Sequence, residues 1–143
     1  MVGVAAISRP GVSGTYLRLV WLSTRHLPVL IRLFGRMDWA GIYHIARTVR
    51  PPEGLPSAYY RLEAIGVAPV AQGEGVGRAL LDATHDFVEH DPGASGIYLF
   101  TGEESTRNLY EQAGYATVGT RRSNEVVAYH MFRPNESVQR DDY

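Results

Sequence analysis

Three alternating glycines in the middle of the chain form the stretch best suited to binding a ligand. Gly73, Gly75 and Gly77 lie between an apolar run that ends at Val67 and an amphipathic segment that follows at once. A glycine-rich turn leading into a helix leaves several backbone N–H groups unpaired at the positive end of the helix dipole. Such a turn binds anions, most often phosphate. The competing interpretation is a tight strand-to-helix turn without a ligand.

Two familiar phosphate-binding loops do not fit this stretch. Its glycines are spaced G-x-G-x-G, whereas dinucleotide-binding domains use G-x-G-x-x-G and place an acidic residue about 20 residues further on, after the next strand. The G-K-[ST] of nucleoside-triphosphate loops is also missing. The ligand class therefore has to come from another motif.

The hexapeptide at residues 72–77, Q-G-E-G-V-G, matches the pattern Q/R-x-x-G-x-G/A. With V-x-P at residues 67–69 and R-A-L-L at residues 78–81, it resembles the pyrophosphate loop of the GNAT superfamily of acyl-CoA-dependent N-acyltransferases. The resemblance implies that acetyl-CoA is bound, and that its pyrophosphate is held by Gln72, Gly73, Glu74, Gly75, Val76, Gly77 and Arg78.

The strand before this loop is expected to hold the pantetheine arm. Gly66 within an apolar strand predicts a bulge or a splayed edge. At such an edge, pantetheine can pair with backbone groups of Ile65, Gly66 and Val67.

A second match to this family lies downstream, where Tyr110 precedes the pair Gly114-Tyr115 by four residues. In the family, a tyrosine at this place lies near the thioester sulfur and often acts as the general acid that protonates the departing CoA thiolate, a role that suits a phenol. The family often has asparagine four residues before it, whereas Thr106 stands there and Asn108 is displaced by two positions. Packing of Tyr110 between helix and sheet is the alternative.

A general base is harder to identify, although amine acetylation requires one because the attacking amine must be neutral. Glu63 lies on a predicted strand four residues before Val67, where some family members offer a base. An ion pair with Arg61 or another cation explains Glu63 equally well.

The histidines give no clear catalytic or metal-binding signal. His44 and His130 favour structural roles on a helix and on the last strand. His26, His85 and His90 show no metal-ligand spacing with one another or with a carboxylate pair, so no metal is predicted.

Length and composition indicate one ordinary globular domain, with 143 residues, 45% of them hydrophobic and 20% charged. A formal net charge of −1 gives no general attraction to nucleic acid or to anionic membranes, so neither is expected as a partner. The chain has no cysteine, no signal-peptide pattern and no apolar run near the ~20 residues that span a bilayer. These features favour a cytoplasmic protein.

The periodicity predicts alternating strands and helices. Strands are expected at residues 2–8, 58–67, 97–101, 115–120 and 126–133, and helices at residues 75–90 and 105–112, with two or three more within residues 14–50. The buried stripe of the helix at residues 75–90 is predicted to include Val76, Leu80, Ala83 and Phe87, with Val88 as a further candidate. Residues 134–143 form a polar and frayed tail in this interpretation.

The GNAT resemblance implies an α/β (α+β) fold, in which helices flank a mixed, mainly antiparallel sheet within a single domain of residues 1–133. A complete GNAT domain opens with a strand, two helices and another strand, which are missing before residues 2–8, so the chain is interpreted as truncated at its N-terminus. The helices of residues 14–50 are then an insertion before the central strand, similar to puromycin-type antibiotic acetyltransferases. An exposed sheet edge favours association, so a homodimer is expected.

These observations predict an N-acetyltransferase that moves an acetyl group from acetyl-CoA to a primary amine by direct attack in a ternary complex. Backbone N–H groups near residues 65–67 polarise the thioester carbonyl, and Tyr110 protonates the thiolate. The acceptor amine, a small molecule or a peptide, is not identified by the sequence. Two alternatives are a truncated, non-catalytic CoA-binding or interaction module, and a helix-rich structural protein with an incidental glycine turn.

Overall fold

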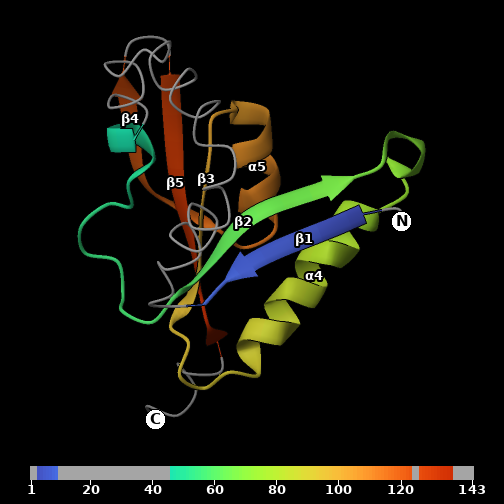
Figure 1. Cartoon of the computed structure of the whole chain (residues 1–143), viewed down its shortest axis with the longest axis horizontal. Coiled ribbons are helices and arrows are strands. Elements are labelled where there is room, and N and C mark those ends of the chain that lie inside the picture. The colour runs from blue at the N-terminus through green and yellow to red at the C-terminus, as the bar shows by residue number, and fades with distance from the viewer. Residues whose placement is uncertain (1–2, 10–45, 124–125, 137–143) are drawn as a thin grey trace, which may run out of the picture.

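The computed structural model describes residues 3–9, 46–123 and 126–136 as one sheet with helices against it (Figure 1). The strands are β1 (Gly3–Ser8), β2 (Tyr60–Val67), β3 (Gly96–Thr101), β4 (Ala116–Ser123) and β5 (Val126–Pro134), in the order β1-β2-β3-β5-β4. The helices are α4 (Val76–Glu89), α5 (Glu104–Gln112) and the short 3-10 helix η2 (Pro69–Ala71). Only β2 and β3 pair in parallel among the described strands, which confirms the mixed, mainly antiparallel sheet.

Both long helices cover the same face of the sheet. Helix α4 packs against β1, β2 and β3, and α5 packs against β3 and β4 (Figure 1). Tyr129 of β5 points toward α5, because its ring centre lies 4.9 Å from the guanidinium carbon of Arg107. The next residue, His130, donates from Nε2 to the carbonyl oxygen of Thr48 at 2.9 Å. Since successive strand residues face opposite sides, the helical turn at residues 46–49 lies on the other face.

Helix α4 buries a different stripe from the one that the periodicity predicts. Its buried residues are Leu81, Thr84, His85 and Val88. Val88, the further candidate, is 2% exposed, which confirms it. Phe87 is 50% exposed and Ala83 is exposed, so the prediction is wrong for these two residues, by about one position. The sequence offers Leu80 beside Leu81 and Phe87 beside Val88, and either member of each pair satisfies a helical period. Contact with the sheet selects the second member.

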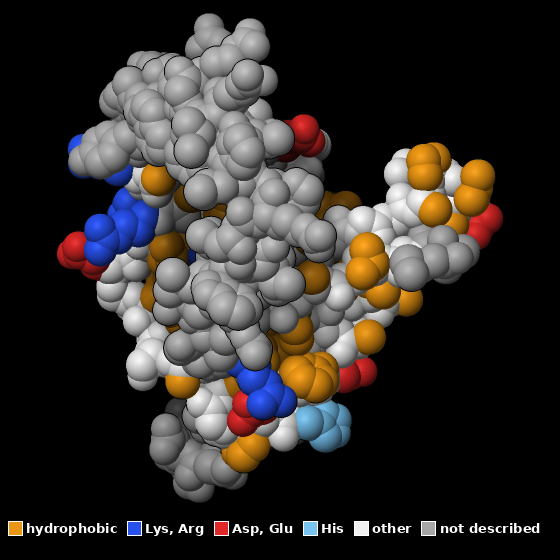
Figure 2. Space-filling view, viewed as in Figure 1, with side chains coloured by type: hydrophobic (Ala, Val, Ile, Leu, Met, Phe, Trp, Pro, Cys, Tyr) orange, Lys and Arg blue, Asp and Glu red, His pale blue; other side chains and the backbone are white. Residues whose placement is uncertain are grey.

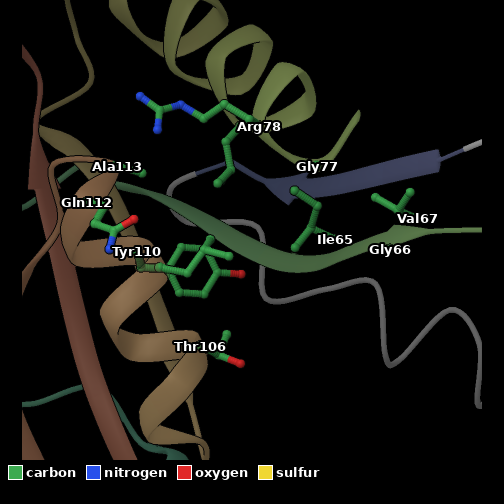
Figure 3. A pocket seen from close by; sticks show the side chains of 11 residues that line it. Ile65, Gly66, Val67, Gly77, Arg78, Thr106, Tyr110, Gln112 and Ala113 are labelled. Atoms are coloured by element: carbon green, nitrogen blue, oxygen red, sulfur yellow. The ribbon is translucent and has the colours of Figure 1, made fainter. Parts of the chain in front are cut away.

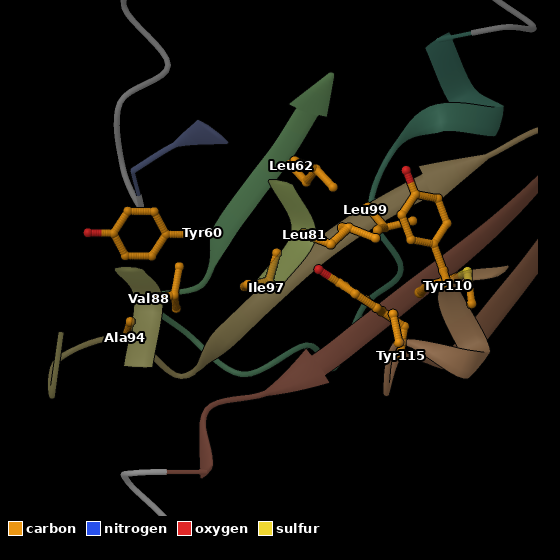
Figure 4. Packing of buried hydrophobic residues seen from close by; sticks show 11 residues of the cluster. Tyr60, Leu62, Leu81, Val88, Ala94, Ile97, Leu99, Tyr110 and Tyr115 are labelled. Carbon is orange, nitrogen blue, oxygen red and sulfur yellow. The ribbon is translucent and has the colours of Figure 1, made fainter. Parts of the chain in front are cut away.

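One cluster of buried apolar side chains joins the helices to the sheet (Figure 4). Leu81 of α4, Leu99 of β3 and Met131 of β5 each expose 2% or less of their surface. Burial of a side chain of this size stabilises the fold by about 1.5–3 kcal/mol. Tyr110 and Tyr115 belong to the same cluster and pack edge to face, with ring centroids 5.5 Å apart.

The start of the predicted tail is well packed. Pro134 is the last residue of β5, and Asn135 is 2% exposed. The Asn135 Nδ2 donates to the carbonyl oxygens of Val88, Asp91 and Ala94 at 3.2, 3.2 and 2.9 Å. The carbonyls of Val88 and Asp91 also accept from the N–H groups of Asp91 and Ala94, each at 3.0 Å, so Asn135 is a second donor to the turn that ends α4. The prediction of fraying from Pro134 is therefore wrong for these two residues.

The remaining predicted elements agree with the structure or lie outside it. Strand β4 continues to Ser123, three residues beyond its predicted end at residue 120. Of the region predicted to be a helical insertion, residues 46–49 form a helical turn, and residues 14–45 lie outside the described residues. Within the described part of the chain, no helix is long and apolar enough to cross a membrane.

Candidate functional site

A cavity of about 380 Å³ lies between β2, α4 and α5 (Figure 3). Its volume is in the range of small-molecule sites. Strand β2 contributes Ile65, Gly66 and Val67, α4 contributes Gly77, Arg78 and Leu81, and α5 with the residue after it contributes Thr106, Leu109, Tyr110, Gln112 and Ala113. Five of the residues predicted from sequence to bind CoA therefore line one cavity together with the predicted general acid.

The cavity forms where two parallel strands diverge. β2 and β3 pair only at Tyr60 and Arg61, the first residues of β2, so the stretch 65–67 has no partner on β3. This confirms the splayed edge predicted there. The bulge, however, is not at Gly66, which pairs with Val4 of β1; the register shifts so that Glu63 is the extra residue. Main-chain groups on the β3 side of residues 65–67 are thus left for a ligand.

The glycine loop places unpaired N–H groups beside the open edge of residues 65–67. Gly73 and Gly75 have φ angles of 85° and 81°, in the left-handed region that favours glycine. Gly75 is the N-cap of α4 and offers no side chain, and the first bond of the helix is from Ala79 N–H to the Gly75 carbonyl at 3.0 Å. The N–H groups of the first turn therefore have no helical partner, and no acidic side chain lies in that turn. An anion is favoured here.

Gln72 plays a different part from the neighbouring glycines. Its Nε2 donates to the Val67 carbonyl oxygen at 3.2 Å, which ties the loop back to the end of β2. Gln72, Gly73, Glu74, Gly75 and Val76 form the loop and helix start without lining the cavity itself. Arg78 lines the cavity and pairs with Asp82 at 3.2 Å, with both side chains more than half exposed.

Tyr110 reaches the cavity from α5, and its ring and hydroxyl point inward (Figure 3). The residue is 7% exposed, and burial raises the pKa of its phenol. It is therefore protonated at neutral pH, as a general acid must be. No hydrogen bond joins its hydroxyl to another described residue. Packing and catalysis are not exclusive alternatives here, because the ring belongs to the core cluster while the oxygen faces the cavity.

Tyr115 and His85 form a buried pair, and Tyr115 packs against Tyr110. The ring of Tyr115 meets that of Tyr110 at 68°, and the Tyr115 hydroxyl lies 3.1 Å from Nε2 of His85. His85 belongs to α4 and Tyr115 follows the end of α5, so this pair connects α4 to the segment between α5 and β4. Burial, followed by the charge of Arg133, lowers the pKa of His85.

Glu63 lies apart from the cavity lining. Its Oε1 accepts a hydrogen bond from the Ser8 hydroxyl at 2.8 Å, and its Oε2 lies 3.4 Å from Nε of Arg61. The Arg61 guanidinium also lies 5.9 and 5.6 Å from the ring centres of Tyr98 and Phe100. The ion pair considered from the sequence is thus present, and the base role of Glu63 stays a prediction.

The residues of α5 beside Tyr110 were not singled out from the sequence. Thr106, Leu109, Tyr110 and Ala113 all line the cavity, whereas Asn108 does not. Their spacing of three, four and seven residues places them on one helix face, and this is the signal that could have found them.

The two described buried histidines are held by other side chains or by the backbone. His130 is fully buried, and its Nδ1 accepts a hydrogen bond from the Tyr98 hydroxyl at 2.6 Å while its Nε2 donates to Thr48. Burial lowers the pKa of His130 and raises that of Tyr98 to about 12. Within the described ranges, no group of three or more His, Cys, Asp or Glu residues could hold a metal ion. His26 and His44 lie outside these ranges.

Comparison with known proteins places this geometry in a family. Residues 38–117 match the family model of the acetyltransferase (GNAT) domain. The N-alpha-acetyltransferase RimI of Mycobacterium tuberculosis is 34% identical over 86 residues, which make up 60% of this chain and 49% of RimI. The chain thus spans about half the length of that curated relative.

Two solved structures resemble almost the whole chain. A histone acetyltransferase HPA2 and related acetyltransferase from Corynebacterium glutamicum superposes with a TM-score of 0.58 at 21% identity, over 94% of this chain and 57% of the other. Naa20 of Chaetomium thermophilum, solved in complex with a bisubstrate analogue, superposes with a TM-score of 0.59 at 16% identity, over 99% of this chain and 63% of the other. At these identities the likeness shows the fold alone.

Proposed function

Because the chain belongs to the GNAT acetyltransferase family, we propose that it transfers the acetyl group of acetyl-CoA to a primary amine by direct attack. One observation carries the proposal: the splayed edge at residues 65–67, the first turn of α4 and the Tyr110 hydroxyl border the same cavity. A long donor with a phosphate end and a thioester end needs all three parts in this order.

The donor is held mainly by main-chain groups in this proposal. Pantetheine pairs with the open edge of Ile65, Gly66 and Val67, as an added strand would. The pyrophosphate rests on the N–H groups of the loop and first turn, residues 72–78, at the positive end of the α4 dipole. Arg78 adds a single exposed cation, so backbone geometry rather than side-chain charge supplies most of the binding.

The chemistry takes place at the Tyr110 end of the cavity. The amine nitrogen attacks the thioester carbonyl carbon, whose oxygen is polarised by N–H groups of residues 65–67. The carbon–sulfur bond breaks, and the thiolate takes the proton of the Tyr110 hydroxyl. The proton lost by the amine passes to a base, and solvent later restores the phenol. Atoms and charge balance without any further reagent.

We propose Glu63 as the base that receives the amine proton. Its carboxylate lies on β2 two residues before Ile65, and its two oxygens are oriented by Ser8 and Arg61. Where the amine and the carboxylate do not meet directly, a water molecule between them would carry the proton.

A second candidate function is CoA binding without acyl transfer. It is favoured by the engagement of Glu63 with Arg61 and Ser8, and by the separation of Glu63 from the cavity lining. Both candidates predict donor binding, and only the first predicts turnover.

Calorimetry and product analysis test the proposal together. The full chain should bind acetyl-CoA, and should bind ADP more weakly, because ADP carries the pyrophosphate but lacks the pantetheine arm that pairs with residues 65–67. A panel of small amines, antibiotics and peptides, screened by mass spectrometry for a mass increase of one acetyl group, should reveal an acceptor. Failure of the folded chain to bind acetyl-CoA would overturn both candidate functions. Binding without acetylation of any amine would favour the second.

The cellular setting belongs to this proposal too. A cytoplasmic, homodimeric enzyme is consistent with the composition and with β1 at the end of the described sheet order. Size-exclusion chromatography with light scattering would measure the oligomeric state.

A further inference from the structure

A recess that shares no described lining residue with the cavity lies where the segment of residues 47–48 meets the end of β4. It has a volume of about 510 Å³ and is lined by Arg47, Thr48, Arg121, Arg122 and Ser123. A smaller recess of about 210 Å³ shares Arg47 and Arg121 with it and adds Arg50, Pro51 and Glu53. The arginine recess is defined as these two adjoining hollows, with their arginines at positions 47, 50, 121 and 122.

Tertiary structure brings the two halves of the arginine recess together. Residues 46–50 and the end of β4 are more than 70 residues apart in sequence, and Arg121 Nη1 donates to the Arg47 carbonyl oxygen at 2.9 Å. This bond holds Arg121, which is half-buried, in a defined position. Figure 2 shows arginine side chains, in blue, gathered at the upper left, where Figure 1 places the turn at residues 46–49 and β4.

Three of the four arginines of the recess have no carboxylate partner in the described part of the chain. No described carboxylate lies within 4.0 Å of the guanidinium nitrogens of Arg50, Arg121 or Arg122. Glu53, the only acid among the described residues that line either hollow, lines the smaller one without pairing at that distance. By contrast, Arg61, Arg78, Arg107 and Arg133 each have a carboxylate partner. Because the whole chain carries a formal charge of −1, this positive field is local.

The chemistry of the walls indicates what kind of ligand fits. The sequence contains no lysine, so every basic side chain is a planar guanidinium. A guanidinium binds carboxylate or phosphate oxygens in pairs, through two parallel N–H···O bonds. Guanidinium groups lie both on β4 and on residues 47–50. The recess therefore suits an anion with more than one oxyanion group.

We propose that the arginine recess binds a small polyanion that carries two or more carboxylates. The carboxylates come either from a free polycarboxylate or from consecutive acidic residues of a peptide. Arg122 and Arg50, which are exposed, contact the ligand first, and Arg121 holds its inner carboxylate.

Titration calorimetry of the full chain tests this proposal with two probes. Citrate represents the free polycarboxylate, and an N-acetylated tetraglutamate peptide represents the acidic segment. At least one should bind at concentrations of about 1 mM or below. Its affinity should fall as sodium chloride is raised, because ion pairing carries the interaction. Binding of citrate alone or of the peptide alone identifies the source of the carboxylates.

Three variants place the binding in the arginine recess. Arg122→Gln removes an exposed guanidinium without a structural bond and should weaken binding about tenfold, as expected for the loss of charged hydrogen bonds. Arg122→Lys keeps the charge but loses the paired geometry, so its affinity for the probe should lie between those of the wild-type chain and Arg122→Gln. Arg78→Gln is the matched control, since it removes an arginine at the other anion-attracting region, the start of α4, and should leave binding unchanged.

Two results would overturn the proposal. One is the absence of binding of both probes to a folded wild-type chain, with folding verified by circular dichroism. The other is full binding of the probes in Arg122→Gln, whatever the result in Arg78→Gln, which would assign the anions to a site other than the arginine recess, such as the α4 loop.

Discussion

The two walls of the cavity are built in different ways. The first wall consists of residues 65–67, 77 and 78, which the glycine loop connects. Its useful groups are main-chain N–H and C=O groups, positioned by glycines with positive φ in that loop. The wall formed by α5 offers side chains on one helix face, and its reactive group is a single phenol. The first wall is suited to holding a donor and the second to changing it. Affinity and turnover should therefore respond to separate mutations.

Removing the Tyr110 hydroxyl should give the largest effect. In Tyr110→Phe the thiolate loses its proton donor, so kcat should fall about 100-fold or more, while acetyl-CoA affinity stays within about twofold. Stability should change by less than about 1 kcal/mol, because the hydroxyl bonds to no other described residue and the ring is retained. Steady-state kinetics on the acceptor found by the screen would measure kcat, with Tyr129→Phe as control. If kcat is unchanged, Tyr110 and the wall formed by α5 have only a structural role.

Distorting the loop should reverse that pattern. A β-branched side chain at a φ of 81° is strained, so Gly75→Val should weaken acetyl-CoA binding about tenfold or more, with kcat at saturation nearly unchanged. No described atom lies within 4 Å of a Cβ at Gly75, so backbone strain alone is responsible. Gly75→Asn is the control, since asparagine tolerates this conformation. Equal loss of affinity in both variants would point to the side chain rather than to backbone geometry.

Releasing the loop from β2 should have a smaller effect on the same wall. Gln72→Ala removes the bond to the Val67 carbonyl, which is worth about 1 kcal/mol, so acetyl-CoA affinity should fall by about two- to fivefold. Glu74→Gln, on the same loop, removes a negative charge near the bound pyrophosphate and should tighten binding slightly. Calorimetry would show whether each variant binds acetyl-CoA more weakly or more tightly than the wild-type chain. Tighter binding by Gln72→Ala would contradict the tie between loop and strand.

Acid should loosen the contact between the walls, with the smallest effect. Burial lowers the pKa of His85 below its ordinary 6.5, so the unfolded chain binds a proton that the folded chain resists. The free energy of unfolding should therefore decrease as the pH falls below 6.5 toward the folded-state pKa, and stay constant above it. Urea denaturation at about pH 7.5 and about pH 5.5 would measure this, and His85→Gln should reduce the difference. His130, whose pKa burial also lowers, is intact in that variant and maintains part of the slope.

Much of this arrangement could be predicted from the sequence, because the residues concerned carry local signals. Alternation of apolar residues located all five described strands, and the glycine spacing located the start of α4 to within one residue. Tyr110 was found through the family resemblance, as the tyrosine four residues before Gly114-Tyr115. Helical periodicity could not choose between Leu80 and Leu81, since adjacent apolar residues fit two neighbouring stripes.

Local sequence determined the loop, its φ angles and the unpaired first turn of α4, because glycine conformation and helix ends depend on neighbours a few residues away. Only the tertiary structure decided that Tyr110 faces residues 65–67 across one cavity, that the bulge falls at Glu63, and that Glu63 pairs with Arg61. These depend on how β2 diverges from β3 and pairs with β1. Such pairings join distant segments, and their register follows from packing of the whole sheet rather than from any one strand.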